Sequence, residues 1–186
     1  MTAISLTKDK ARLLEILRKD AFFKEKITLS SGKTSDFYID ARRVTLSAEG
    51  SYLCAKLILD LLRDEKVDAI GGPTLGADPM LGAIGVVSFQ SGKPVKTFII
   101  RKAPKPYGKQ QQIEGPLLKT GDRVVLIDDV ATTGKAFLQS IDVLIPMGIK
   151  ADLAVCIVDR DEGAVEALAQ KQCKLISIFK SAEIIH

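Results

Sequence analysis

The chain has 186 residues, of which 46% are hydrophobic and 27% are charged, and its formal net charge is +4. These values indicate one globular domain, alone or with a short appendage, and exclude an intrinsically disordered chain. Nucleic-acid-binding proteins concentrate far more positive charge on one face, and the chain has neither an apolar run as long as a membrane span nor an apolar signal segment. We therefore expect a cytoplasmic protein without nucleic-acid or membrane partners.

The first third of the chain contains two amphipathic segments separated by a turn-rich stretch. A helix is predicted near the N-terminus, with Thr7 as its N-cap. Ser30–Gly32 is typical of a turn and Phe37–Ile39 of a short strand. A second helix is expected after Ser47. Its apolar stripe consists of Leu53, Cys54, Leu57, Ile58, Leu61 and Leu62.

Strands and helices alternate through the remaining chain. We expect strands at residues 67–70, 95–100, 124–127, 153–158 and 175–179, and helices at residues 77–88, 134–145 and around 165–168. This order predicts an α/β fold with a parallel sheet covered by helices on both faces. Right-handed crossovers bring the carboxyl ends of the strands to one edge, where ligands bind. Residues 101–116 are polar and basic without periodicity, so we expect a long loop there.

The few cysteine and histidine residues exclude several kinds of site. Cys54, Cys156 and Cys173 are far apart in the sequence and contain no CxxC pair, so neither a disulfide framework nor a zinc site is expected. Each lies near apolar residues, as small core residues do. The only histidine is His186. A Ser-His-Asp triad, a Cys-His dyad and a histidine metal cluster are therefore excluded.

The most informative motif runs from Val124 to Ala136. Four apolar residues form a buried strand, and Asp128 and Asp129 then fall at the carboxyl edge of the sheet. The small, hydroxyl-rich turn Ala131–Gly134 opens the next helix, where backbone N–H groups, threonine hydroxyls and the helix dipole all favour negative charge. We interpret the turn as a cradle for a phosphate monoester. The two carboxylates suit the vicinal hydroxyls of a ribose, directly or through a magnesium shell.

The motif has three alternative interpretations. A Walker A loop needs glycine at position 129 and serine or threonine at position 136, where Asp129 and Ala136 stand. A phosphoacceptor receiver domain has its acidic pair near the N-terminus, whereas Asp129 lies in the last third of the chain. A simple N-capped turn with solvated aspartates is the remaining alternative.

Residues 124–136 resemble the phosphoribosyl pyrophosphate signature of the type I phosphoribosyltransferases, a long and specific pattern. Three further segments resemble the orotate branch of this family in the same order along the chain. They are Thr28–Ser35 with Phe37–Ile39, Gly71–Pro79, and Arg101–Gly108 with Ile113–Gly115. The resemblance implies transfer of ribose 5-phosphate from phosphoribosyl pyrophosphate to orotate, with Mg²⁺, giving orotidine 5′-monophosphate and pyrophosphate in pyrimidine biosynthesis.

The resemblance also implies roles for individual residues. Lys105, Asp128 and Asp129 match catalytic positions, and magnesium is expected to bind mainly through the substrate rather than at a protein metal site. The positions that match the phosphoribosyl pyrophosphate site are Arg101, Lys102, Lys105, Tyr107, Asp128, Asp129, Val130, Ala131, Thr132, Thr133, Gly134, Lys135 and Ala136. Those that match the orotate site are Tyr38, Ile39, Thr132 and Arg160. In this family the flap that carries Lys102 and Lys105 serves the opposite subunit, so a homodimer with shared active sites is implied.

The composition of the loop at 101–116 agrees with this assignment. Lysines closing over pyrophosphate would stabilise the charge that grows on it, and closure would keep water from an oxocarbenium-like ribosyl centre. A solvated basic loop is one alternative. An RNA-contacting loop is another, and it is disfavoured because Tyr107 is the only aromatic residue in this loop. We assign no side chain as an obligatory base, and Lys105 is the best candidate for a catalytic contact.

Several positions depart from the family pattern. Many bacterial relatives have histidine where Tyr107 stands, and some have lysine at the position of Ser30 and a Tyr-Lys pair at Leu75–Gly76. A phenol can still donate a hydrogen bond to phosphate. The missing cations indicate another subgroup, with different contacts to pyrophosphate.

We therefore expect a type I phosphoribosyltransferase fold, a parallel sheet flanked by helices with a small N-terminal hood. The hood spans about residues 1–45 together with a C-terminal segment, the core about 46–175, and the flexible catalytic loop about 101–116. Two alternatives remain open. A phosphoribosyltransferase for another base would differ in the hood and around Arg160. A regulator that senses phosphoribosyl pyrophosphate and binds nucleic acid would need a DNA-binding helix pair or a basic face, and this chain has no room for the helix pair.

Overall fold

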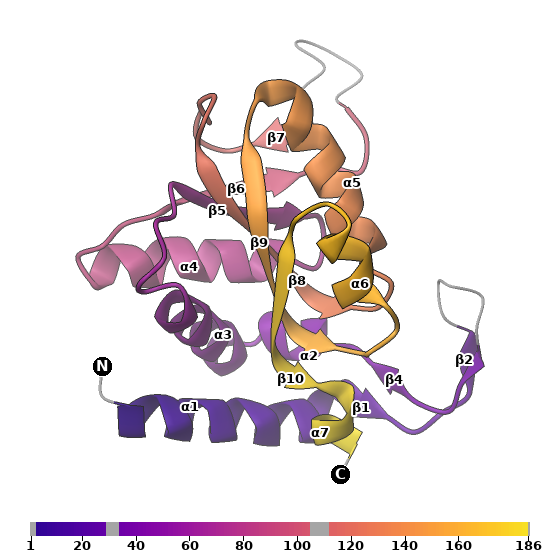
Figure 1. Cartoon of the computed structure of the whole chain (residues 1–186). Coiled ribbons are helices and arrows are strands. Elements are labelled where there is room, and N and C mark those ends of the chain that lie inside the picture. The colour runs from indigo at the N-terminus through magenta and orange to yellow at the C-terminus, as the bar shows by residue number, and fades with distance from the viewer. Residues whose placement is uncertain (1–2, 29–33, 105–111, 186) are drawn as a thin grey trace.

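The computed structural model describes residues 3–28, 34–104 and 112–185 (Figure 1). Its N-terminal part is a long helix followed by two small antiparallel sheets, β1 with β4 and β2 with β3. The elements of this part are α1 (Ala3–Ile16), the π-helical turn η1 (Leu17–Ala21), β1 (Phe22–Phe23), β2 (Ile27–Thr28), β3 (Thr34–Ser35), β4 (Tyr38–Ile39) and α2 (Arg42–Thr45). The C-terminal helix α7 (Ser181–Ile185) lies beside η1, where the Arg18 guanidinium donates two hydrogen bonds to the Glu183 carbonyl.

The rest of the chain builds a six-stranded sheet in the order β10-β9-β8-β5-β6-β7. All neighbouring strands are parallel except β7, which pairs antiparallel with β6. The strands are β5 (Ala69–Pro73), β6 (Lys96–Ile100), β7 (Ile113–Glu114), β8 (Arg123–Ala131), β9 (Lys150–Asp159) and β10 (Lys174–Lys180). The helices are α3 (Ala48–Leu61), α4 (Asp78–Gln90), α5 (Lys135–Leu144), the 3-10 turn η2 (Ile145–Met147) and α6 (Ala164–Ala169).

The expected alternation of strands and helices is confirmed, with three local differences. Helix α1 begins at Ala3, so the prediction of an N-cap at Thr7 was wrong. Strand β7 lies inside the segment expected to be a loop, and it makes the sheet mixed rather than wholly parallel. Strands β8 and β9 run past their apolar stretches to Ala131 and Asp159, because these two residues remain paired in register.

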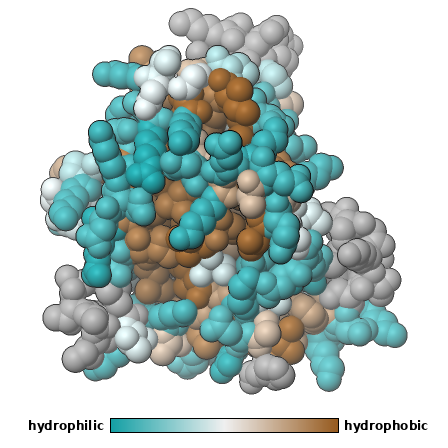
Figure 2. Space-filling view, viewed as in Figure 1, coloured by the Kyte–Doolittle hydropathy of each residue, from teal (hydrophilic) through white to brown (hydrophobic). Residues whose placement is uncertain are grey.

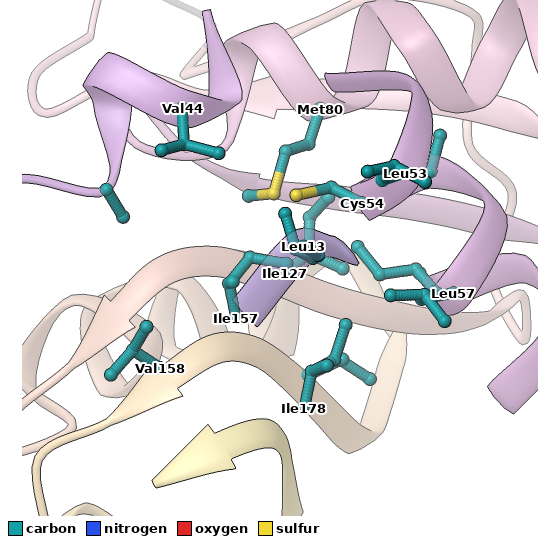
Figure 3. Close-up of a cluster of buried hydrophobic side chains, with 14 of the residues drawn as sticks. Leu13, Val44, Leu53, Cys54, Leu57, Met80, Ile127, Ile157, Val158 and Ile178 are labelled. Carbon is teal, nitrogen blue, oxygen red and sulfur yellow. The ribbon is translucent and has the colours of Figure 1, made fainter. Parts of the chain in front are cut away.

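One face of the sheet is covered by α1, α2, α3 and α4. Side chains from these helices pack on Ile127, Ile157, Val158 and Ile178 of the strands (Figure 3). Cys54 of α3 and Met80 of α4 point toward one another within this cluster. The stripe expected along α3 is buried except for Leu61, which is partly exposed, and the Ser47 hydroxyl caps the helix by accepting a hydrogen bond from the Gly50 N–H.

The opposite face is covered by α5 and α6. Phe137, Ile141, Leu144 and Leu168 pack there on alternate residues of β8 and β9. Burial on both faces explains why these strands are apolar almost without interruption. Cys54, Cys156 and Cys173 are free and buried, as expected for core residues, and burial raises the pKa of Cys54 to about 12. Among the described residues, no helix is long and apolar enough to cross a membrane.

The carboxyl ends of β5, β6, β8, β9 and β10 meet at one edge of the sheet. The segments that leave this edge begin at Thr74, Arg101, Thr132, Arg160 and Ser181. Four of these five segments contain residues that the sequence analysis selected as site candidates or matched to the family. The parallel topology therefore collects side chains that are up to half the chain apart in sequence.

Candidate active site

Asp128 and Asp129 lie near the end of β8, where the strand is still paired with β9. Asp128 is only 8% exposed and Asp129 is partly buried. Each carboxylate accepts a hydrogen bond from the next backbone N–H: Asp128 Oδ1 from Asp129 at 2.9 Å, and Asp129 Oδ1 from Val130 at 2.7 Å. These bonds fix both side chains against the strand and leave their other oxygen atoms for a ligand.

Burial raises the pKa of Asp128 well above its ordinary value, and repulsion from Asp129 adds to the effect. Burial also raises the pKa of Asp129, while the Val130 N–H and the positive charge of Arg42 act in the opposite direction. Two carboxyl groups held this close and this deep favour a shared proton unless a ligand compensates their charge. The pair is thus suited to donors such as ribose hydroxyls or to a cation.

The segment after β5 closes over the two aspartates. A Cβ atom at Gly76 would come within 2.2 Å of Asp128 Oδ1 and 2.6 Å of Asp129 Oδ1, so only glycine fits there. The Thr74 hydroxyl donates a hydrogen bond of 2.7 Å to Asp78 Oδ2 in the first turn of α4. This contact connects the end of β5 to the helix that follows it.

The turn between β8 and α5 borders a cavity of about 510 Å³. Gly134, the N-cap of α5, has a φ of 77°, and a Cβ atom there would collide with Leu168 of α6. The N-terminus of α5 therefore faces the cavity with its unpaired N–H groups and its positive dipole end. The cavity is lined by Asp128, Val130, Ala131, Thr132, Thr133, Gly134, Lys135, Ala136, Phe137 and Gln139. The structure thus brings together every candidate residue of the predicted phosphate turn.

Arg101 and Lys102 leave β6 beside this cavity. They line a neighbouring cavity of about 480 Å³, which shares Ala136 and Gln139 with the first. The Arg101 N–H donates to the Gln112 carbonyl at 2.8 Å, and its guanidinium lies 3.4 Å from Glu114 on β7. Strand β7 therefore brings the chain back to β6 and orients Arg101. Lys105 and Tyr107 lie outside the described residues.

The predicted base-contacting residues of the hood have different environments. Ile39 is buried in the core, whereas Tyr38 is partly exposed and its hydroxyl accepts a hydrogen bond of 3.4 Å from Arg42. The Arg42 guanidinium also donates to Asp40 at 3.0 Å. Arg42 was not selected from the sequence, although it contacts Tyr38 and the charge of Asp129 contributes to raising its pKa.

Arg160 follows β9 and is held by the backbone and by its side chain. Its N–H donates to the Ala131 carbonyl at 2.9 Å, which places it beside the phosphate turn. Its side chain is 4% exposed, its guanidinium carbon lies 4.7 Å from the centre of the Phe37 ring, and its Nε donates to Glu162 at 2.7 Å. The carboxylates of Asp159 and Asp161, on either side of Arg160 in the sequence, both accept hydrogen bonds from Lys180.

Comparison with known proteins gives a consistent result over nearly the full length. The orotate phosphoribosyltransferase of Rhodopseudomonas palustris (strain TIE-1) is 38% identical over 187 residues, which cover 98% of this chain and 100% of that relative. The chain belongs to the orotate phosphoribosyltransferase family. No family model matches the sequence.

Solved structures of this family have the same fold. The orotate phosphoribosyltransferase of Mycobacterium tuberculosis H37Rv in complex with Fe(III) dicitrate matches with a TM-score of 0.83 at 35% identity, covering 95% of this chain and 98% of that one. The complex of the same enzyme with phosphoribosyl pyrophosphate matches with a TM-score of 0.79 at 31% identity, covering 96% and 99%. The type I phosphoribosyltransferase fold expected from the sequence is confirmed.

Three residues at the candidate site of this orotate phosphoribosyltransferase family member were not selected from the sequence. Phe37 was matched to the family only as part of the segment Phe37–Ile39 and was given no role, yet its ring packs on Arg160. Glu162 and Arg42 gave no signal in the sequence, because a charged residue near a strand end is usually solvated. In the folded structure, Glu162 contacts Arg160 and Arg42 contacts Tyr38.

Proposed function

We propose that this chain transfers the 5-phosphoribosyl group of phosphoribosyl pyrophosphate to N1 of orotate, with orotidine 5′-monophosphate and pyrophosphate as products. The bond from the ribose C1 to the pyrophosphate oxygen breaks as the bond from C1 to the ring nitrogen forms, and the proton of that nitrogen passes to the departing pyrophosphate or to water. The observation that carries the proposal is the pair of Asp128, which is buried, and Asp129, which is partly buried, beside the cavity at the N-terminus of α5. Membership of the orotate phosphoribosyltransferase family supports the same reaction.

The ribose 5-phosphate half of the substrate fits the turn after β8. The N–H groups and hydroxyls of Ala131–Lys135 would bind the 5′-phosphate, with the dipole of α5 favouring its charge. The ribose hydroxyls would then donate to Asp128 and Asp129, whose pKa values are raised chiefly by burial, and these hydrogen bonds would stabilise the charged carboxylates. Hydrogen bonds from the two ribose hydroxyls would hold C1 in a fixed direction for the attacking nitrogen.

The pyrophosphate would lie toward the end of β6. Arg101 and Lys102 border the cavity there, and Lys105 and Tyr107 follow in the same segment of sequence. Cations around the leaving group stabilise the charge that accumulates on it as the C1–oxygen bond breaks, which lowers the barrier of the chemical step. Lys105 remains our candidate for the catalytic contact.

Orotate would bind between the hood and the end of β9. Arg160 is buried at this boundary, and its guanidinium can pair with the carboxylate of orotate through two parallel hydrogen bonds. Tyr38 on β4 and Thr132 on the phosphate turn are the neighbouring polar residues of the proposed base site, and Ile39 supports it from the core. The pairing with Arg160 would distinguish orotate from bases that lack a carboxylate.

The residues at the aspartate pair fit Mg²⁺, because they offer only oxygen ligands and a cation would relieve the repulsion between the two carboxylates. Asp128 and Asp129 would hold the ion indirectly, through the ribose hydroxyls and water, with the pyrophosphate oxygens as its main ligands. Bound there, Mg²⁺ supplies charge neutralisation to the pyrophosphate.

We further propose a homodimer in which the segment carrying Lys102 and Lys105 reaches the partner's site. Large apolar side chains on α3 and α4 are exposed, among them Phe89 at 75%, Val86 at 59% and Tyr52 at 48%. Figure 2 shows hydrophobic residues gathered over the region where Figure 1 draws these two helices. An apolar area of this kind is typical of a surface that a second subunit covers. The buried, reduced cysteines are compatible with the cytoplasm, where we place the reaction.

The proposal is tested by comparing the wild type with the double variant Asp128→Asn/Asp129→Asn, using Asp64→Asn at an exposed position as the control. Formation of orotidine 5′-monophosphate is measured with orotate, phosphoribosyl pyrophosphate and Mg²⁺. The wild type and the control should form product at equal rates, and the double variant should form none while it retains a cooperative melting transition. Near-normal product formation by the folded double variant would refute the assignment of the site.

A further inference from the structure

Glu162 contacts Arg160 but has no role in the proposed reaction. Its Oε1 accepts a hydrogen bond of 2.7 Å from Arg160 Nε, and both side chains are largely buried, at 4% and 18% exposure. One face of the guanidinium is covered by the Phe37 ring, whose centre lies 4.7 Å from the guanidinium carbon. A carboxylate on the edge and an aromatic ring on the face together fix the plane of the guanidinium.

The turn that carries Glu162 is itself held in place. Asp159 Oδ1 accepts a hydrogen bond from the Asp161 N–H at 2.9 Å, and Lys180 of β10 donates to the carboxylates of both aspartates. Asp161 has a φ of 55°, a left-handed conformation that lets the chain reverse between Arg160 and Glu162. The turn from which Glu162 approaches Arg160 is therefore held by hydrogen bonds within it and to β10.

The ion pair is poorly explained as a stabilising contact alone. The second carboxylate oxygen of Glu162, Oε2, is buried and accepts no hydrogen bond from the described residues. A buried carboxylate that is only half satisfied adds little net stability, because its desolvation offsets the attraction to its partner. The geometry suits orientation of Arg160 better than it suits stabilisation of the fold.

We propose that Glu162 is a positioning residue that orients Arg160 for the carboxylate of orotate. A guanidinium presents its N–H donors in fixed directions within one plane, so holding Nε and the plane determines where its other donors point. This inference rests on the proposed function, in which Arg160 pairs with orotate. It assigns to Glu162 no contact with either substrate.

Two substitutions separate the effect of the length of the Glu162 side chain from the effect of its charge. Glu162→Gln keeps the length of the side chain and an acceptor oxygen for Nε, whereas Glu162→Asp keeps the charge but withdraws the acceptor by one methylene group. Glu166 on α6 is exposed and offers matched controls, Glu166→Gln and Glu166→Asp. Positioning predicts that Glu162→Gln behaves nearly as the wild type and that Glu162→Asp is impaired. A role of the charge alone predicts the reverse.

The experiment measures KM for orotate, KM for phosphoribosyl pyrophosphate, kcat and the melting temperature of all five proteins. We expect Glu162→Asp to raise KM for orotate about tenfold, the effect of losing one hydrogen bond to a charged group. Glu162→Gln should change it less than about threefold, and KM for phosphoribosyl pyrophosphate should change less than about twofold in every variant. Should Glu162→Asp not fold, Glu162→Leu, which offers no acceptor, replaces it with the same expected rise.

Several results would overturn the inference. The first is a normal KM for orotate in Glu162→Asp, and the second is equal impairment of Glu162→Asp and Glu162→Gln. The third is a parallel rise in the KM values for both substrates together with a lower melting temperature. Arg160→Lys distinguishes this failure from failure of the proposed function. If Arg160→Lys is impaired with orotate and Glu162→Asp is not, only the positioning role falls. If Arg160→Lys is also unimpaired, both the positioning role of Glu162 and the proposed recognition of orotate by Arg160 are refuted.

Discussion

Arg160→Lys is expected to lower kcat/KM for orotate by about 2–3 kcal/mol, or roughly 30- to 160-fold. Lysine at this buried position would lose the second of two parallel hydrogen bonds to the carboxylate, and each hydrogen bond to a charged group is worth about 1.5–3 kcal/mol. It would also weaken the contacts of the guanidinium with Phe37 and Glu162. Were Arg160 only part of a surface ion pair, the loss would be at most about 1 kcal/mol.

The assay compares orotate with uracil, which lacks the carboxylate, for the wild type and the variant. Uracil should be a poor substrate for both proteins and should lose little on mutation, and KM for phosphoribosyl pyrophosphate should barely change. An equal loss for both bases would show that Arg160 supports the fold or the other substrate. No loss for orotate would remove Arg160 from the base site.

Three further predictions concern the aspartates, the glycine above them and the dimer. Burial raises the pKa values of Asp128 and Asp129, so the folded protein is most stable when both carboxyl groups are neutral. The free energy of unfolding therefore falls as the pH rises through these raised pKa values and the buried groups ionise. The melting temperature of Asp128→Asn/Asp129→Asn should therefore exceed that of the wild type increasingly from about pH 4 toward neutrality, and a constant difference would contradict the burial argument. Gly76→Ala should lower kcat on the order of 100-fold because its Cβ displaces both carboxylates, while Gly82→Ala, where no atom lies within 4 Å, should leave kcat unchanged. Mixing inactive Lys105→Ala subunits with inactive Asp128→Asn/Asp129→Asn subunits should restore part of the activity, and if subunits exchange without restoring it, the shared site is refuted.

The core of the fold and the phosphate turn could be predicted from the sequence because their signals are local. The apolar run before Asp128 and the small residues from Ala131 to Gly134 specify a buried strand and a helix N-terminus without reference to the rest of the chain. Parallel topology then determines which segments meet at the edge of the sheet. The strand lengths were less predictable. Strands β8 and β9 continue past their apolar residues because they remain hydrogen-bonded to each other, which the composition of either strand does not indicate.

The contacts around the base site could not be predicted, since they arise between elements. Strands of two residues, such as β4 and β7, are too short to show a period. The approach of Glu162 to Arg160 depends on the left-handed conformation of Asp161, for which an aspartate is only a weak signal. Phe37 reaches Arg160 only because the hood folds over the end of β9.

The most direct test of the account is the choice of base. The purified protein is incubated with phosphoribosyl pyrophosphate, Mg²⁺ and, in separate reactions, orotate, uracil, adenine and hypoxanthine, and nucleotide and pyrophosphate are both measured. We predict that orotate alone is converted efficiently, with one pyrophosphate released for each orotidine 5′-monophosphate formed. Efficient formation of a purine nucleotide, or of uridine monophosphate from uracil, would contradict the assignment of Arg160 and of the base site.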